Sequence, residues 1–591
     1  MPGRFAADFE TTTKPPVRVW AWGIADTDTP ERVEIGDSMD GFFEWMKEQK
    51  KNPTIYFHNE KFDGAFILYY LLTHGYTWRK TRGDCCGMDF TTIIDNFGKF
   101  FAIEIYWKRK GKRVKKATIY DSFKLVPMSV EKAAGAFGLK ITKLDIDYDR
   151  HNDPGVKMSP LERLYIEHDV SIVAQILQKF FAAGLQSMTI GACAVKDYKA
   201  TIGDRNYWAW FPETPYEIDQ EMRDAYLGGW MYVNPQHKGL DVGTGYTLDV
   251  NALYPYIMHD KPLPWGIPVS FSGQYEADPE RPLYIQKLVC AFRLKPGKLP
   301  TIQLRSTPSF MPAEYATKCD QLVELCLSSV DLALFFEHYD VFVTEWRGGW
   351  KFYASDKMFK TWVDKWQAVK EQADRDGNEG LRQIAKLIMV NLYGKFSTNP
   401  KRQSKMPVYS KIKDIVEYMP IETPCTDEFG QPVLDEHGQQ VTTTFEIIPA
   451  KYVALSIFVT AWGRDMTIRA AQRIHEESLL RNEGESIFCY ANTDSLHLIG
   501  DELPEFLEID PHKLGAWKVE YIFTRARFLN PNRYILDNGH SLKVRCSGLS
   551  AEQIEQVTFD NFKPGAIYSG KLVPRACPGG VVLRHQIFTL H

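Results

Sequence analysis

Two short segments, far apart in the chain, most constrain what it can fold into. Each is expected to form a β-strand whose end presents a carboxylate: LDVNALYP at 248–255 presents Asp249, and YANTDS at 490–495 presents Asp494. If the fold brings these strand ends together, the two acids can hold divalent metal ions against a triphosphate. That convergence is the core requirement for joining a nucleotide to a primer hydroxyl. We therefore expect a site built from residues that are distant in sequence.

Length and composition point to a multidomain globular protein. A chain of 591 residues is too long for one hydrophobic core, so about four domains are expected. The sequence contains no apolar run of about 18 residues and no amino-terminal signal pattern, which predicts a soluble intracellular protein without a membrane partner. The 10 cysteines include no pair of CxxC elements, which argues against a zinc site and for reduced thiols.

Charge gives two opposed indications about nucleic acid. The net charge of -4 argues weakly against binding a polyanion, because positive protein surfaces displace counterions from phosphate. Two segments, KRKGKRVKK at 108–116 and NPKRQSKMPVYSKIK at 399–413, are dense in Lys and Arg and argue the other way. The alternative for both is a solvated loop, and charge alone leaves the choice open.

The first third of the chain predicts a second acidic site. Alternation in RFAADFETTT indicates a strand with Asp8 and Glu10 on one face, although an isolated DxE is more often a solvated strand face. IYFHNEKFDGAFIL at 55–68 is expected to form a strand and the start of a helix that carries Asp63. PLERLYIEHDVSIVAQILQKFF at 160–181 is predicted to be a helix in which Tyr165 and Asp169, four residues apart, share one face. The apolar stripe of that helix is Ile166, Val170, Val173, Leu177 and Phe181.

The order DxE, NxxxD, YxxxD resembles the three motifs of proofreading 3'-5' exonucleases. The resemblance implies that Asp8, Glu10, Asp63 and Asp169 hold two metal ions, which activate water and stabilise the departing 3' oxygen. It further implies that Tyr165 orients the attacking water and Lys143 stabilises the scissile phosphate. The residues assigned to gripping the single-stranded 3' end are Thr11, His58, Asn59, Phe62, Ser122, Phe123 and Tyr148. Without the resemblance, Ser122, Phe123 and Tyr148 are better interpreted as loop or core residues.

The remaining motifs resemble the family-B DNA polymerases. YLGG at 226–229, DVNALYP, a lysine-bearing helix that ends in YG at 393–394, and TDS at 493–495 follow in that family's order. A tight turn is the commoner explanation of paired glycines taken alone. The chain is most similar to the protein-primed bacteriophage subgroup of phi29 type, from Asp8 to the final PGGVVL segment.

This resemblance implies a multidomain α/β and α+β fold, with an RNase H-like 3'-5' exonuclease domain followed by a right-hand polymerase of palm, fingers and thumb with two insertions. The expected parts are the exonuclease domain at 1–189, the palm at 190–260 and 449–548, insertions at 261–355 and 397–448, the fingers at 356–396 and the thumb at 549–591.

From the residues alone, the first insertion is a small α+β module. The second predicts a β-hairpin that turns at Gly438, or else a disordered linker. The resemblance adds that the first insertion docks the priming protein and the duplex, and that the second encircles DNA and separates its strands.

In the polymerising site, Asp249, Asp494 and the Val250 carbonyl are the implied ligands of two Mg²⁺ ions, with Mn²⁺ as the alternative metal. Tyr254 would stack beneath the deoxyribose and exclude a 2'-hydroxyl. Two helices joined near Gly377 and Gly380 are expected to form the fingers. Their implied nucleotide-binding residues are Lys370, Arg382, Lys386 and Tyr393. The implied DNA contacts are Tyr226, Gly228, Gly229, Gly394, Arg533 and Tyr534.

The sequence departs from the family pattern at several positions. Ala252 stands where Ser is common, and VNLYG at 390–394 replaces NSxYG. Asn492 replaces the first acid of YxDTDS, so restoring Asp there is expected to raise nucleotide incorporation. Asn532 stands at the lysine of KxY, and the adjacent Arg533 is expected to substitute for that lysine. The segment at 192–212 has little periodicity, and a domain boundary is placed near Ile190.

Three functional hypotheses follow. The leading one is a phage-encoded DNA polymerase that acts in the cytoplasm of a bacterial host on primer-template DNA and dNTPs. It edits errors at a separate site and starts from a terminal protein, as a monomer or as a heterodimer with that protein. The rival is a 3'-5' exonuclease whose polymerase site is impaired by Asn492. A carbohydrate-active enzyme using paired acids is weaker, because it leaves the lysine helix and the motif order unexplained.

Overall fold

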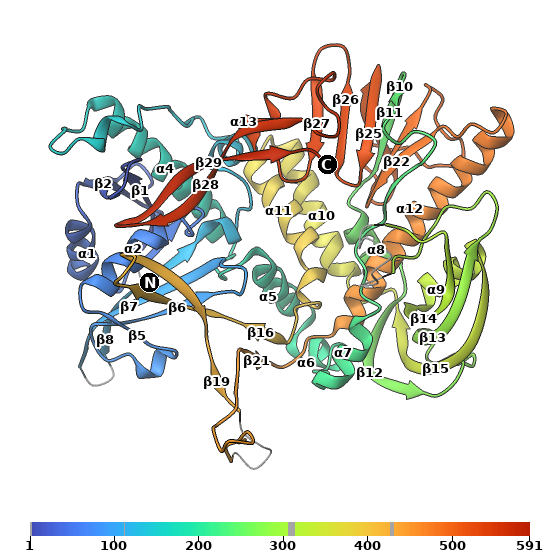
Figure 1. The fold of residues 1–591 in the computed structure, drawn as a ribbon, viewed down its shortest axis with the longest axis horizontal. Helices are drawn as coiled ribbons and strands as arrows, with labels where there is room; N and C mark the ends of the chain where they lie inside the picture. Colours follow the sequence, from blue (N-terminus) through green and yellow to red (C-terminus); the bar gives the residue numbers. More distant parts are fainter. Residues whose placement is uncertain (1–2, 111–112, 305–313, 426–430) are drawn as a thin grey trace.

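The computed structural model of the protein describes residues 3–110, 113–304, 314–425 and 431–591, drawn in Figure 1. Parts of three sequence features lie outside this range: residues 111–112 of the basic run, the end of PTIQLRS at 305–306, and residues 427–430 of the predicted hairpin. The side chains of residues 108–110 and 113 also lie outside it.

The first domain is built on one eight-stranded sheet of order β3-β2-β1-β4-β8-β7-β6-β5. β1 runs antiparallel to β2 and parallel to β4, so it lies inside the sheet. The long helix α4 contacts β1, and a capping box at Ser159 and Glu162 fixes where α4 begins. The strands are β1 (Arg4–Thr11), β2 (Val19–Asp26), β3 (Val33–Gly36), β4 (Thr54–Phe57), β5 (Thr77–Trp78), β6 (Asp89–Ile94), β7 (Phe100–Lys110) and β8 (Arg113–Asp121). The helices are α1 (Met39–Glu48), α2 (Asp63–Thr73), α3 (Val130–Ala136) and α4 (Pro160–Ala182).

The segment after α4 is helical, which corrects the expectation of an irregular stretch. It forms α5 (Ile190–Ile202), α6 (Asp204–Trp210) and α7 (Tyr216–Arg223). Thr189 caps α5, and Tyr198 of α5 stacks on Phe359 at a centroid distance of 4.7 Å. Contacts with distant residues therefore bury a helix whose own sequence periodicity is weak.

Two sheets lie in the segments expected to form the palm. The first has the order β24-β11-β23-β22-β9, and the second has the order β10-β25-β26-β27. The 29-residue helix α12 contacts β22 and α8. The palm strands are β9 (Met231–Val233), β10 (Asp241–Val242), β11 (Gly245–Val250), β22 (Phe488–Asn492), β23 (Ser495–Ile499), β24 (Trp517–Phe523), β25 (Arg525–Asn530), β26 (Arg533–Asp537) and β27 (Leu542–Cys546). The palm helices are α8 (Leu253–Asp260) and α12 (Val453–Arg481).

The segment expected to form the fingers contains two helices packed against each other, α10 (Lys360–Arg375) and α11 (Glu379–Asn391). Gly377 lies in the turn between them, with φ +64. Gly380 does not lie in the turn, because α11 has already begun at Glu379. A Cβ at position 380 would come within 2.9 Å of the Lys179 side chain, so this glycine allows α11 to pass close to α4.

Both insertions contain β-structure. The first is the expected α+β module, a four-stranded sheet of order β12-β15-β13-β14 with one helix. Its elements are β12 (Leu263–Phe271), β13 (Leu283–Leu294), β14 (Lys318–Ser328), α9 (Ser329–His338) and β15 (Tyr339–Ser355). The second pairs β16 with β21, β17 with β18, and β19 with β20. These strands are β16 (Lys401–Gln403), β17 (Lys405–Ser410), β18 (Ile415–Pro420), β19 (Thr423–Pro424), β20 (Thr442–Thr443) and β21 (Phe445–Ile447). Its tip extends away from the rest of the molecule (Figure 1), and the Gly438 backbone N–H donates to Asp435 in the expected turn.

The thumb region consists of α13 (Ala551–Ile554) and a ribbon of β28 (Ile567–Cys577) and β29 (Gly580–Thr589). The ribbon reaches back to the first domain (Figure 1), where the Val17 backbone N–H donates to the Pro578 carbonyl at 3.0 Å. Val581 and Val582 are buried in the same hydrophobic cluster as Phe57 and Phe66. The carboxy-terminal segment is therefore part of the core of the amino-terminal domain.

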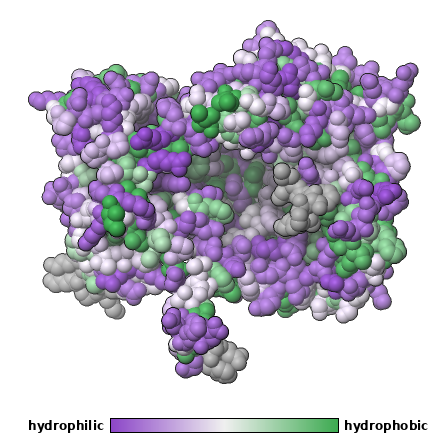
Figure 2. Space-filling model, in the orientation of Figure 1, coloured by the Kyte–Doolittle hydropathy of each residue, from purple (hydrophilic) through white to green (hydrophobic). Residues whose placement is uncertain are grey.

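The face shown in Figure 2 is hydrophilic over most of its area and is hollowed near its centre, where Figure 1 places α10 and α11. All 10 cysteines lie among the described residues and are free thiols, as expected. In the described part of the chain, no helix has both the length and the apolar character needed to cross a bilayer.

Candidate active sites

Four acids converge in the first domain, as the motif order predicts. Asp8 and Glu10 lie two residues apart on β1, Asp63 is the first residue of α2, and Asp169 lies on α4. The Asp63 carboxylate accepts from the Phe9 backbone N–H at 3.3 Å, which fixes α2 against β1. Glu10, Asp63 and Asp169 are all buried.

Burial and mutual repulsion dominate the electrostatics of this cluster. Burial, followed by repulsion from Asp169, raises the pKa of Asp8 to about 7. Burial also raises the pKa of Glu10 and of Asp63, and the Asp8 charge adds to both shifts. Removing several carboxylates from water without a counter-charge is costly, so the cluster favours a cation. Shifts of this kind are typical of functional sites.

Lys143 and Tyr165 lie beside these acids. The Lys143 ammonium is 3.0 Å from an Asp169 oxygen and 5.5 Å from the Tyr165 ring centroid. Burial alone would lower the pKa of Lys143, but attraction to Asp169 and Asp8 outweighs it and raises the pKa. The hydroxyls of Tyr148 and Tyr165 are 3.3 Å apart. The structure thus brings together the side chains assigned to water orientation and phosphate stabilisation.

The residues assigned to the single-stranded 3' end have different environments. His58 uses both ring nitrogens inside the protein, with Ser122 Oγ at 3.0 Å and the Met128 carbonyl at 2.7 Å. Ser122 is 1% exposed, and its hydroxyl donates to the Phe57 carbonyl. The described contacts of this pair are therefore internal. The other members of the set are Thr11, Asn59, Phe62, Phe123 and Tyr148, all at least partly exposed, and their contact with DNA stays a prediction.

Sequence reasoning missed Asp121, which organises this surface. Its carboxylate accepts from the backbone N–H groups of Asn59 and Phe123, both at 2.9 Å. Asn59 has φ +69, so an acceptor at this point stabilises a left-handed turn. The sequence gives no signal for Asp121, because a single acidic residue at the end of a strand is common.

Asp249 and Asp494 meet at one end of the palm sheet. β11 pairs with β23 so that Asp249 lies opposite Ser495, and the Val250 backbone N–H donates to the Asp494 carbonyl at 2.8 Å. Burial raises the pKa of Asp494 to about 6, with repulsion from Asp249 as the next cause. Burial also raises the pKa of Asp249, against the lowering effect of Lys518. The predicted convergence of these two acids is confirmed.

Lys518 is a second residue that the sequence did not reveal. β24 pairs with β11 so that Lys518 lies opposite Asp249, and its ammonium is 3.0 Å from the Asp249 carboxylate. No motif marks this lysine; only strand pairing places it at the site.

Two tyrosines lie over the same end of the sheet. The rings of Tyr254 and Tyr393 have centroids 4.5 Å apart. Gly463 of α12 lies close to Tyr254, because a Cβ there would be only 3.2 Å from the Tyr254 ring. Burial raises the pKa of Tyr254 to about 12, so its hydroxyl is protonated at neutral pH. Gly394, the residue after Tyr393, is exposed and has open space at its Cβ position.

The cations expected in the fingers face the acids of the palm. Burial lowers the pKa of Lys370, and the charges of Arg382, Lys518 and Lys386 lower it further, so these cations form one electropositive group. The charge of Lys386 is felt at Asp249 across the gap between fingers and palm. Arg382 pairs with Asp374 of the neighbouring helix.

A buried arginine supports the YLGG loop and was also missed from sequence. Arg464 donates to the carbonyls of Leu227 and Gly228, both at 2.7 Å, and forms a two-bond ion pair with Asp331. Gly229 lies against Thr493, since a Cβ would meet the Thr493 side chain at 2.5 Å. Tyr226 accepts a hydrogen bond from Ser397 at 3.2 Å. Gly229 therefore serves close packing beside Asp494, whereas a Cβ at Gly228 would meet open space, and the predicted contact of both glycines with DNA is untested.

The expectation that Arg533 substitutes for a lysine at position 532 stays a prediction. Asn532 lies in the turn before β26 with φ +58, and Arg533, the first residue of β26, donates to the His591 carbonyl. Asn532 instead meets Asn492, whose Nδ2 donates to the Asn532 Oδ1 at 3.0 Å. Tyr534 is only 6% exposed and packs near Tyr490 and His497.

The carboxylate oxygens show whether these residues fit the expected metal ions. Asp169 Oδ1 is buried and has no hydrogen-bond partner among the described residues, and orphaned oxygens of this kind suit a hard cation. As the side chains are placed, no three His, Cys, Asp or Glu groups of the described residues are close enough to share an ion. Carboxylates are ligands that Mg²⁺ binds, and these side chains would have to rotate to complete its coordination shell.

Comparison with known proteins decides the family. The family model for DNA polymerase type B, organellar and viral, matches residues 45–159 and 153–428. The chain belongs to this family of type B DNA polymerases. The DNA polymerase of Bacillus phage M2 is 37% identical over 99% of both chains. That of Bacillus phage phi29 is 36% identical over 99% of this chain and 98% of its own length.

The solved structures agree with this family assignment. Phi29 DNA polymerase complexed with primer-template DNA and incoming nucleotide matches this type B polymerase with a TM-score of 0.88 at 34% identity, over all of both chains. The resemblance to phi29-type enzymes and the expected multidomain fold class, an exonuclease domain followed by a polymerase, are thereby confirmed. The domain boundaries and the individual site roles stay predictions.

Proposed function

We propose that this type B polymerase adds deoxynucleotides to a primer 3'-hydroxyl under the direction of a DNA template. The observation that carries the proposal is the meeting of Asp249 and Asp494 at one end of the palm sheet, opposite Lys370 and Lys386 of the fingers. Acids that hold metal on one side and cations that balance a triphosphate on the other are what nucleotidyl transfer requires.

Asp249, Asp494 and the Val250 carbonyl would hold two Mg²⁺ ions, with Mn²⁺ as the alternative. Such ions, when bound, activate the attacking hydroxyl and neutralise charge on the leaving group. Lys370, Arg382 and Lys386 would bind the triphosphate and hold its charge. Tyr254, fixed between Tyr393 and Gly463, would leave no space for a 2'-hydroxyl on the incoming sugar.

The four-acid cluster of the first domain supports 3'-5' proofreading at a separate site. Asp8, Glu10, Asp63 and Asp169 would hold metal, and Tyr165 would orient water. Lys143, already paired with Asp169, would interact with the scissile phosphate when DNA enters.

Protein-primed initiation and strand displacement follow from the likeness to phi29-type enzymes. The first insertion would dock a terminal protein, and the extended second insertion would separate strands ahead of the primer. The partners are primer-template DNA, dNTPs and the terminal protein. The Bacillus phage relatives support a phage-encoded enzyme that acts in the bacterial cytoplasm.

Primer extension tests the proposal. Incubation with primed template, Mg²⁺ and four dNTPs should lengthen a labelled primer. Asp249→Asn should abolish extension but retain 3' degradation, because the nuclease acids are in another domain. Asp63→Asn should do the reverse.

The rival is an exonuclease whose polymerase site is impaired by Asn492. Degradation without any extension, with Asp249→Asn no different from the unaltered protein, would establish this rival. Covalent attachment of a labelled nucleotide to a terminal protein would separately test protein priming.

A further inference from the structure

Two amide side chains join the turn that carries Asp494 to a different sheet. Asn492 is the last residue of β22 in the five-stranded sheet, and Asn532 lies in the turn between β25 and β26 of the four-stranded sheet. Asn492 Nδ2 donates to Asn532 Oδ1 at 3.0 Å. Because Asp494 is only two residues beyond Asn492, this bond fixes one side of the polymerising site.

The backbone holds both asparagines in place. Asn532 has φ +58, a conformation that Asn tolerates better than most residues, and its N–H donates to the Tyr490 hydroxyl at 2.9 Å. On the other side, the Thr493 hydroxyl donates to Asn492 Oδ1 at 3.3 Å, and the Thr493 N–H donates to the Trp230 carbonyl at 2.8 Å. The contact therefore joins two fixed turns.

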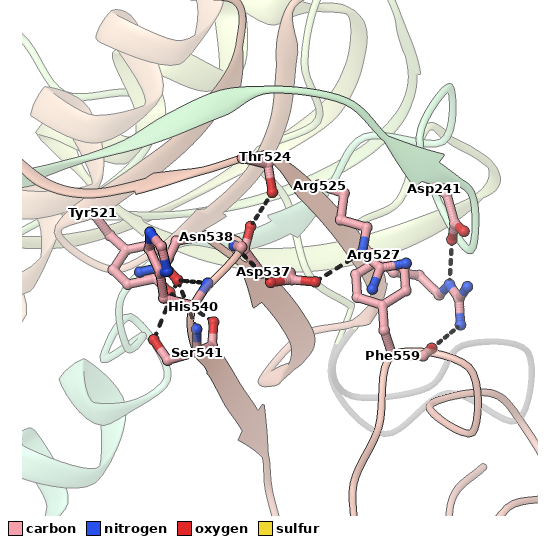
Figure 3. A network of polar contacts seen from close by, with 11 residues as sticks. Asp241, Tyr521, Thr524, Arg525, Arg527, Asp537, Asn538, His540, Ser541 and Phe559 are labelled. Atoms are coloured by element: carbon pink, nitrogen blue, oxygen red, sulfur yellow. Dashed lines mark hydrogen bonds and ion pairs between the residues drawn. The ribbon is translucent and has the colours of Figure 1, made fainter.

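The hairpin that carries Asn532 is itself anchored (Figure 3). Arg525 pairs with Asp537 at 2.9 Å across β25 and β26, and Arg527 donates to the Phe559 carbonyl at 2.9 Å while it pairs with Asp241. A displacement of the Asn492 turn relative to this hairpin would break the amide contact without deforming the hairpin.

The two positions also depart together from the family pattern, which has an acid at 492 and a lysine at 532. The structure shows that these departures face each other. An acid and a lysine placed at these two positions would form a pair of opposite charges with the same summed charge as the neutral pair of amides. An acid at position 492 alone would add an unpaired negative charge beside Asp494 and Asp249. Its carboxylate would also face the side-chain oxygen of Asn532.

We propose that Asn492 and Asn532 are a neutral pair of positioning residues that sets the place of Asp494, and that Asn492 is not a weakened metal ligand. The proposal rests on the proposed polymerase function. It reverses the expectation from sequence alone, because Asn492→Asp in isolation should now lower nucleotide incorporation.

Charge reconstruction tests the pair. Primer-extension kcat and the KM for dNTP are measured for Asn492→Asp, Asn532→Lys and the double variant. Each single change should lower kcat about tenfold, and the double variant should return to within about threefold of the unaltered enzyme. A rise in kcat for Asn492→Asp alone would overturn the proposal, as would a double variant no better than the worse single variant.

Asn538→Asp is the matched control. It makes the same change in the exposed turn between β26 and β27, in the sheet next to Asn532, and there the Asn538 side chain accepts from the neighbouring His540 and Ser541. It should leave kcat unchanged.

Melting temperatures of the same variants provide a readout that does not need activity. If the unaltered protein extends no primer, the proposed function fails, yet positive coupling in melting temperature still supports the pair. Additive shifts overturn it.

Discussion

At the scale of single residues, backbone strain collects at the two sites. Among the described residues, seven residues other than glycine have positive φ, and four of them lie in or beside the two candidate sites. Ala252 turns the chain into α8 after Asp249, and Thr493 precedes Asp494. Asn59 and Asn532 are the other two. Such conformations persist only where surrounding contacts over-determine them, and their presence here marks turns that present side chains to a substrate.

His497 gives a prediction about pH at the same scale. It is buried behind Asp494, with Nδ1 bonded to Thr247 at 3.0 Å, and burial lowers its pKa to about 3. The unfolded chain binds a proton near pH 6.5 while the folded chain does not, so stability from this group is complete above pH 6.5 and is lost as the pH falls towards 3. The loss at pH 5 is about 2 kcal/mol.

His497→Asn keeps an acceptor for Thr247 but cannot titrate. Its stability deficit relative to the unaltered protein should therefore shrink by about 2 kcal/mol between pH 7.5 and pH 5, measured by denaturant unfolding. The exposed His512→Asn is the matched control. A deficit that stays constant with pH would contradict the assignment.

At the scale of elements, α12 connects the first insertion to the palm through a buried ion pair, alongside more exposed ones. Arg464 is 3% exposed and reaches Asp331 of α9 and the YLGG loop together. Buried pairs of this kind add little net stability, but losing one partner leaves an uncompensated charge. Through Arg464, the position of the YLGG loop beside Asp494 depends on contact with the first insertion.

Arg464→Met should lower the free energy of unfolding by about 3 to 5 kcal/mol, because it strands Asp331. The double change with Asp331→Leu should recover most of that loss. Arg469, on the same helix as Arg464, is half-exposed and pairs with Asp465 of α12 and Glu337 of α9. Arg469→Met should therefore cost less than about 1 kcal/mol. Denaturant unfolding measures all three, and equal losses for Arg464→Met and Arg469→Met would contradict the argument.

At the scale of the whole molecule, the two ends of the chain share a core. The turn between β28 and β29 packs so closely on β2 and its preceding segment that a Cβ at Gly579 would be 1.9 Å from the Val17 carbonyl. Tyr69 of α2 also bonds to Asp414 of the second insertion at 2.7 Å. The first domain therefore holds the thumb and the second insertion on one side.

Gly579→Ala should release the thumb from the first domain. Hydrogen exchange at the Val17 amide should become faster, and products made in a single binding event should become shorter. Gly565→Ala is the matched control, because Gly565 also has positive φ, +87, but has open space at its Cβ. Equal effects of the two changes would show that backbone strain, and not the lost contact, is responsible.

Local sequence was enough to predict the acids and the elements that carry them. Asp8 and Glu10 alternate on a strand, Tyr165 and Asp169 share a helix face, and Asp494 follows a strand, because local periodicity and turn residues fix these features. The tertiary structure decided what faces those residues. Lys518 reaches Asp249 through strand pairing, Asp121 holds the turn at Asn59, Arg464 is buried between an insertion and a loop, and Asn532 rather than Arg533 meets Asn492. These partners lie at least 40 residues away from the groups they contact, and no local pattern records which distant side chains close packing brings together.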